Sequence, residues 1–317
     1  MQTLRPLGLG EVLDRAVNLT VRFFVPLALI YLVFAVPLGF VQFFAYRDVF
    51  HTLSEITSAI QMQAAGGKPV DPNALARSMS HASTPSGWTA ATFVLAFLVG
   101  PLPTGALIEA VSAYYVGRSV TFGSAYRVGL VRWLPLIGVN LLYLAAGVAL
   151  YVAFTLAALV LIFGAAFLGH AAGIALGIGV GVAVLAAAFA FAVVAALALQ
   201  TSYFTCVIES EGVVRSFARG LSRIFSRIGL RRALLFGAAY IAIGLGIALV
   251  GFAGEAALVA LTHSAAVAAT YSTILRVVTV AFSTAFVEIF YFDLRVREEG
   301  YDLQLAAEAA VARSLPV

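Results

Sequence analysis

Six apolar stretches fill most of this 317-residue chain, and each is long enough to cross a lipid bilayer. A helical crossing needs about 20 mainly apolar residues. Hydrophobic residues make up 62% of the chain and charged residues 11%, whereas soluble domains contain about 45–50% apolar and about 25% charged residues. The sequence therefore predicts an all-α integral membrane protein with six transmembrane helices. The expected spans are residues 23–46, 88–115, 133–163, 171–207, 233–261 and 271–292.

The basic residues are distributed unevenly between the segments that join these spans. Fifteen of the nineteen Lys and Arg residues lie in the two termini and in the segments after the second and fourth spans. Basic residues close to spans favour the cytoplasmic side of a membrane. We therefore expect a cell inner-membrane protein with both termini cytoplasmic, including a tail at 293–317. The segment 47–87 is then an extracytoplasmic loop, and helical spacing of its apolar residues predicts an amphipathic helix in its first half.

A similar segment precedes the first, third and fifth spans. Residues 10–23, 123–133 and 212–227 each begin near a glycine, continue with basic and apolar residues at helical spacing, and lead into an apolar stretch. This threefold pattern predicts three transmembrane hairpins, each preceded by a cytoplasmic amphipathic helix. The whole chain, 1–317, would form a single membrane domain.

The arginines of these segments are candidate contacts for anionic lipid headgroups. In the third segment, arginines recur every four residues beside an apolar face, as in helices that lie in a membrane interface. The alternative is that the segment only fixes the orientation of the spans. The candidate headgroup contacts are Arg15, Arg22, Arg127, Arg132, Arg215, Arg219, Arg223 and Arg227.

Five ionisable residues fall within or at the ends of the expected spans, where charge is costly and suggests pairing or function. They form a candidate intramembrane polar site: Glu109, Glu255, Arg276, Glu288 and Asp293. Glu255 and Arg276 belong to consecutive spans, so we expect them to pair or to share a polar recess. Glu109 and Glu288 are either structural or part of a proton or substrate pathway. Asp293 either joins a local charge cluster or receives an arginine from a cytoplasmic helix.

Four segments resemble a known family. They are residues 4–16, residues 105–118 with 125–127, residues 207–212, and residues 291–303, which begin Tyr-Phe-Asp-Leu-Arg-Val-Arg. These segments are similar to bacterial multi-pass proteins of the glycerophosphoryl diester phosphodiesterase membrane domain family. The resemblance implies a multi-pass membrane protein without an assigned activity. A phosphodiesterase barrel needs about 200 or more residues of alternating strands and helices, and no such region is expected here.

The sequence contains no motif typical of an active site, a cofactor site or a metal site. We therefore expect a non-catalytic membrane protein without cofactors, acting as a scaffold, lipid-interacting factor or regulator. Its expected partners are membrane lipids with anionic headgroups, with a homo-oligomer or membrane-protein partner as a further possibility and no nucleic acid. The alternative is a transporter or channel for a small substrate that uses the buried carboxylates. A membrane-embedded lipid enzyme is disfavoured, because no nucleophile and base pair is evident.

Overall fold

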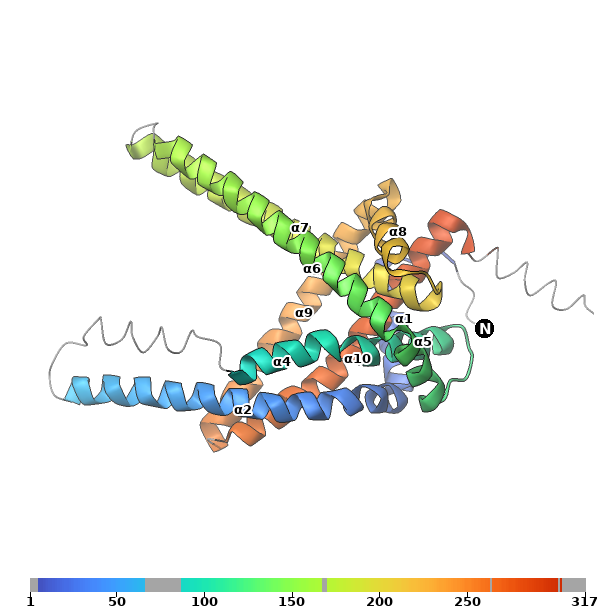
Figure 1. Ribbon diagram of the computed structural model, residues 1–317, viewed down its shortest axis with the longest axis horizontal. Coiled ribbons are helices and arrows are strands. Elements are labelled where there is room, and N and C mark those ends of the chain that lie inside the picture. Colours follow the sequence, from blue (N-terminus) through green and yellow to red (C-terminus); the bar gives the residue numbers. More distant parts are fainter. Residues whose placement is uncertain (1–4, 66–86, 167–169, 263, 302, 304–317) are drawn as a thin grey trace, which may run out of the picture.

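The computed structural model describes residues 5–65, 87–166, 170–262, 264–301 and 303, and the regular structure of these residues is entirely helical (Figure 1). Their order along the chain is α1 (Leu9–Arg22), α2 (Phe24–Ala65), α4 (Gly87–Leu98), α5 (Pro101–Tyr115), α6 (Phe122–Ala166), α7 (His170–Ile208), α8 (Val213–Phe225), α9 (Arg227–Thr262) and α10 (Ala265–Glu299).

Five of these helices contain a segment long and apolar enough to cross a membrane: α2, α6, α7, α9 and α10. A sixth crossing results if α4 and α5 together form one span. These two helices meet at an angle of 42°. Pro101 and Pro103 open α5 and cannot donate backbone hydrogen bonds, which explains the break. The predicted all-helical architecture is confirmed for the described residues, which contain five or six candidate spans long and apolar enough to cross a membrane.

Two of the three predicted amphipathic segments form separate helices. α1 stops one residue before α2, and Pro26 in the first turn of α2 lacks the N–H group that would continue the hydrogen bonding. α8 stops one residue before α9, where the Ser226 hydroxyl accepts a hydrogen bond from the Gly229 N–H at 2.8 Å and so caps α9.

The prediction of a separate amphipathic helix before the third span is wrong. α6 runs without a break for 45 residues, from Phe122 through Pro135 to Ala166. Gly129 does not interrupt it, because its missing side chain allows close packing against Leu102 and Ala106 of α5. The helix predicted within 47–87 likewise continues α2 as far as Ala65 instead of forming a separate element. Residues 66–86 lie outside the described residues.

Most of the buried side chains gather at one end of the molecule, where α1, α5 and α8 pack around α7 and the last turns of α10. We call this the arginine-rich end, because it contains the basic residues of α1, of α8 and of the start of α9. Its largest fully buried side chains are Tyr291, Phe204, Phe236, Phe286, Phe290 and Phe292.

From this end, α6 and α7 extend together as a long pair that diverges from α2 (Figure 1). Large apolar side chains such as Leu144, Tyr151 and Leu156 are exposed along α6. An apolar surface of this kind is suited to lipid, since water would leave it unfavourably solvated.

Candidate functional site

A buried arginine joins α8 to α7 and α10 at the arginine-rich end. The Arg223 guanidinium donates to Glu209 at 2.6 Å, to Thr205 at 3.0 Å and to Glu299 at 2.5 Å. It also lies 5.4 Å from the centre of the Tyr291 ring, whose hydroxyl donates to Glu209. These contacts connect the loop after α7 to the last turn of α10.

Neighbouring arginines complete this network. Arg219 donates to Glu209 at 3.0 Å and forms an ion pair with Glu211 at 2.8 Å, and Arg295 forms one with Glu299 at 2.9 Å. Burial alone would raise the pKa of the Glu209 carboxyl, but hydrogen bonds from Arg223 and Tyr291 and the charges of the arginines hold this pKa below its ordinary value. Glu209 is therefore a carboxylate that stabilises the folded network.

The structure contradicts the expected headgroup contact at one arginine of the stripe, Arg223. Arg223 is 7% exposed and turned inward. Arg219 is partly exposed but paired, and Arg215 lies 3.7 Å from Glu211. Four residues advance a helix by about 40° beyond one full turn, so the stripe drifts until Arg223 faces α7 and α10.

The other candidate headgroup arginines differ in position. Arg127 and Arg227 are exposed. Arg132 donates to the carbonyl oxygen of Ser210 at 3.2 Å, and Arg15 donates to the Tyr115 hydroxyl at 3.1 Å. Arg22 is exposed beside a pocket between α1 and α5.

Asp293 forms a second buried charge cluster, which ties the N-terminal segment to α9 and α10. Its carboxylate is 2.6 Å from Arg232 and 3.1 Å from Arg297, and it accepts a hydrogen bond from the Leu7 N–H at 2.7 Å. Both arginines also donate to the Leu7 carbonyl oxygen, at 2.6 and 3.1 Å. Asp293 thus pairs locally with Arg297 of its own helix and with Arg232 at the start of α9, and not with an arginine of the amphipathic helices α1 and α8.

Glu288 is the one described acidic residue that is completely buried without a hydrogen-bond partner on either carboxyl oxygen. It lies five residues before Asp293 on α10, and α10 packs against α5, which carries Glu109. Glu109 is partly exposed and lies 3.9 Å from Arg118. The structure therefore brings together the two carboxyl groups that the sequence suggested as one pathway.

The sequence predicts that Glu255 and Arg276 pair or share a polar recess. Among the described residues they form no ion pair within 4 Å, and Tyr46 of α2 interacts with both of them. Arg276 also interacts with Tyr31 and lines a pocket between α2, α4 and α10.

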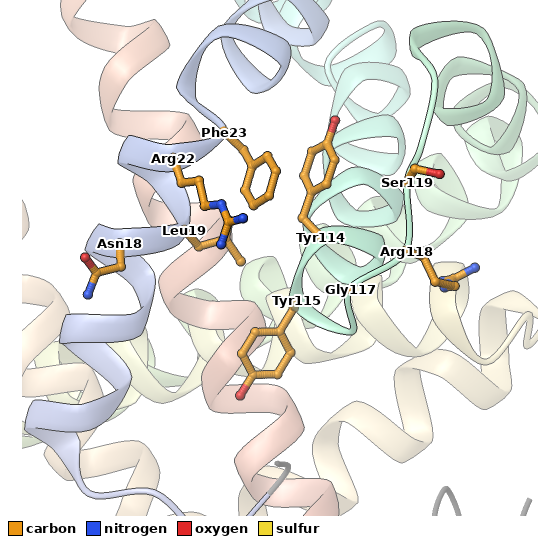
Figure 2. Close-up of a pocket in the computed structure, with 9 residues that line it drawn as sticks. All are labelled: Asn18, Leu19, Arg22, Phe23, Tyr114, Tyr115, Gly117, Arg118 and Ser119. Atoms are coloured by element: carbon orange, nitrogen blue, oxygen red, sulfur yellow. The ribbon is translucent and has the colours of Figure 1, made fainter. Parts of the chain in front are cut away.

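A pocket of about 460 Å³ opens between the end of α1 and the end of α5 at the arginine-rich end (Figure 2). Arg22 and Phe23 reach into it from one side, and the Phe23 ring stacks on Tyr114 with 4.1 Å between the ring centres. The lining comprises Asn18, Leu19, Arg22, Phe23, Tyr114, Tyr115, Gly117, Arg118 and Ser119.

Gly117 shapes the far wall of this pocket. Its φ of 81° is in the left-handed region, where a residue with a Cβ atom is strained. This conformation ends α5 and lets the Arg118 N–H donate to the Ala113 carbonyl oxygen at 2.7 Å. Arg118 and Ser119 are thereby placed on the α5 side of the pocket, where their side chains extend away from Arg22 (Figure 2).

The pocket is suited to an anion. Two arginines, Arg22 and Arg118, line it. Among the described residues, the only carboxylate within ion-pair distance of either is Glu109, which lies 3.9 Å from Arg118. Guanidinium groups bind phosphate through paired hydrogen bonds, while the neighbouring aromatic rings provide an apolar, interfacial surface. A group of three or more His, Cys, Asp or Glu residues placed to hold a metal ion is absent from the described residues.

Sequence reasoning missed Arg118 as a member of this site, and it missed Glu209 and Glu211 as partners of the arginines. The available signal was local: Gly117 follows a helix, and Glu209 and Glu211 immediately precede the basic segment. Comparison with known proteins adds no assignment, because no family model, curated protein or solved structure matches this chain.

Proposed function

We propose that this chain is a non-catalytic inner-membrane protein that binds anionic lipid headgroups at its arginine-rich end. The observation that carries the proposal is the pocket between α1 and α5, with Arg22 and Arg118 beside stacked aromatic rings. Arginines close to an anionic leaflet each contribute about 1 kcal/mol to binding. The role would be that of a lipid-dependent scaffold or regulator.

The topology belongs to the same proposal. The chain crosses the membrane six times, as three hairpins made by α2 with α4–α5, α6 with α7, and α9 with α10, and both termini are cytoplasmic. The asymmetry of the basic residues supports this orientation. The resemblance to the membrane domain of bacterial glycerophosphoryl diester phosphodiesterase proteins agrees with a multi-pass protein without its own active site.

The double substitution Arg22→Gln with Arg118→Gln tests the headgroup site. We expect the variant to retain phosphatidylglycerol about 10- to 30-fold less well than the parent protein, because two arginines contribute about 2 kcal/mol. The measurement is the binding of phosphatidylglycerol to the purified protein by native mass spectrometry. The matched control, Arg127→Gln with Arg231→Gln, removes two exposed arginines away from the pocket. Equal losses in both double variants would show that overall charge, and not the pocket, retains the lipid.

The second candidate function is transport coupled to a proton, and Glu288 is the observation that favours it. A buried carboxyl group without a partner is costly to the fold, so a purely structural position would favour an apolar residue. Glu109 and Arg118 provide a route from Glu288 towards the arginine-rich end.

Replacing Glu288 by Leu separates the structural role from the transport role. We expect Glu288→Leu to raise the stability of the folded protein by about 1–3 kcal/mol. The substitution replaces an unsatisfied carboxyl group by an apolar side chain of similar size. The measurement is thermal unfolding in detergent, together with proton uptake into proteoliposomes. A stabilised variant with unchanged proton flux would exclude the transport function, whereas a loss of stability would contradict the burial of Glu288 without a partner.

A further inference from the structure

The second pocket of interest lies at the opposite end of the candidate spans, between α2, α4 and α10. It has a volume of about 470 Å³, which is within the range of small-ligand sites. Its walls are Gln42, Ala45, Tyr46, Thr89, Thr92, Phe93, Ala96 and Arg276. None of these residues belongs to the pocket between α1 and α5.

The depth of this pocket is indicated by Trp88, at the start of α4. Its ring stacks on Phe44 with 4.6 Å between the ring centres, and tryptophan is enriched at the boundary between lipid and water. Thr89 and Thr92 follow on the same helix. The pocket therefore lies at the level where headgroups meet acyl chains.

Arg276 gives the pocket its charge. It is partly buried, and among the described residues no carboxylate forms an ion pair with its guanidinium group. Tyr31 and Tyr46 interact with it, and Tyr46 also interacts with Glu255, whose carboxylate does not line the pocket. An arginine at this depth without a directly paired carboxylate is costly, and an anionic ligand in the pocket would supply that charge.

The rest of the lining is divided between polar and apolar groups. Gln42 and Tyr46 lie on α2 near the charged end, whereas Phe93 and Ala96 continue along α4 towards the lipid core. We propose that this pocket binds the anionic headgroup of a single amphiphile, a carboxylate or a phosphate, whose acyl chain leaves along Phe93 and Ala96. The two sources of that chemistry are a fatty acid and an anionic phospholipid.

Trp88 supplies a local reporter for the test. The chain has two tryptophans, so the Trp133→Phe variant leaves Trp88 as the fluorescent one. In nanodiscs, dibrominated oleate, dibrominated phosphatidylglycerol and dibrominated phosphatidylcholine are compared as quenchers of Trp88. We expect at least one of the two anionic lipids to quench at a mole fraction about tenfold lower than phosphatidylcholine. A preference for oleate identifies a carboxylate site, and a preference for phosphatidylglycerol identifies a phosphate site.

Arg276→Gln should abolish the tenfold preference, and Arg276→Lys should retain most of it. Arg47→Gln is the matched control, because Arg47 is exposed and directly follows Tyr46. Equal quenching by all three lipids in the Trp133→Phe protein would overturn the proposal before any arginine is changed. A preference that persists in Arg276→Gln would overturn it as well. Neither result depends on the Arg22 and Arg118 pocket, so this proposal and the function proposed above fail separately.

Discussion

Asp293→Asn is expected to destabilise the folded protein by about 3–5 kcal/mol, as the loss of one partner from a buried ion pair generally does. The substitution keeps the shape of the side chain but removes its charge. Arg232 and Arg297 would then face a neutral amide in a position where the Asp293 side chain is 0% exposed. The Leu7 backbone, which both arginines and the carboxylate hold, should separate from α10.

Cys206 provides the measurement for this prediction. It is the single cysteine of the chain and is buried in α7, so a thiol-reactive dye reports unfolding when the purified protein is heated. We expect the melting temperature of Asp293→Asn to fall by at least about 6 °C. Asp14→Asn, which changes an exposed carboxylate on α1, is the matched control and should shift it by less than about 1 °C. Similar shifts in the two variants would contradict the role of Asp293 in holding the Leu7 backbone against α10.

Arg223→Met should have an effect of similar size, about 3 kcal/mol or more. Methionine fills a comparable volume, but it leaves the carboxylates of Glu209 and Glu299 without the guanidinium group that lies 2.6 and 2.5 Å away. Arg219 still faces Glu209, which places the expected cost at the lower end of the range. Arg227→Met is the control, because Arg227 is exposed. The same thermal unfolding assay applies, and a loss confined to Arg227→Met would contradict the network.

The network around Arg223 also predicts how stability depends on pH. The folded protein holds the pKa of Glu209 below its ordinary value of 4.5. The stability contributed by this group is therefore fully present above about pH 4.5 and is lost as the pH falls through the lower, folded value. Neutral and alkaline buffers should leave this contribution unchanged. In Arg223→Met the acid-dependent loss should become smaller, because the partner that lowers the pKa is gone.

The membrane class and the positions of the spans could be predicted from the sequence, because a run of apolar residues is a local property. Apart from Phe23, the expected spans 23–46 and 271–292 each fall within a single long helix, α2 or α10. Helix ends were less predictable. Pro101 and Pro103 follow a break between α4 and α5, whereas Pro37 and Pro135 are accommodated inside α2 and α6.

The candidate sites could be predicted only in part, because they join residues far apart in sequence. The pocket between α1 and α5 unites Arg22 with Arg118, and Asp293 binds the backbone of Leu7. Such contacts leave no periodic pattern in the sequence. The inward orientation of Arg223 could have been predicted from the sequence, since the drift of an arginine stripe with a four-residue period follows from helix geometry alone.

The two pockets give the arginines different roles on the two sides of the molecule. At the arginine-rich end, most of the guanidinium charge of α8 is neutralised internally by Glu209, Glu211 and Glu299. Arg22 and Arg118 remain at the surface of a pocket. At the opposite end, Arg276 is the charged residue among those that line the second pocket. The lipid-binding account therefore depends on Arg22, Arg118 and Arg276, which lie outside the networks around Arg223 and Asp293.

Site-directed labelling of single cysteines tests the six-span account most directly. In a Cys206→Ser background, Gly87→Cys, Ser119→Cys, Ser222→Cys and Ser264→Cys are each exposed to a membrane-impermeant maleimide on intact cells. We expect labelling at positions 87 and 264 and none at 119 and 222 until the cells are opened. Labelling of positions 87 and 119 from the same side would show that α4 and α5 do not cross the membrane, and would contradict an arginine-rich end assembled on one face.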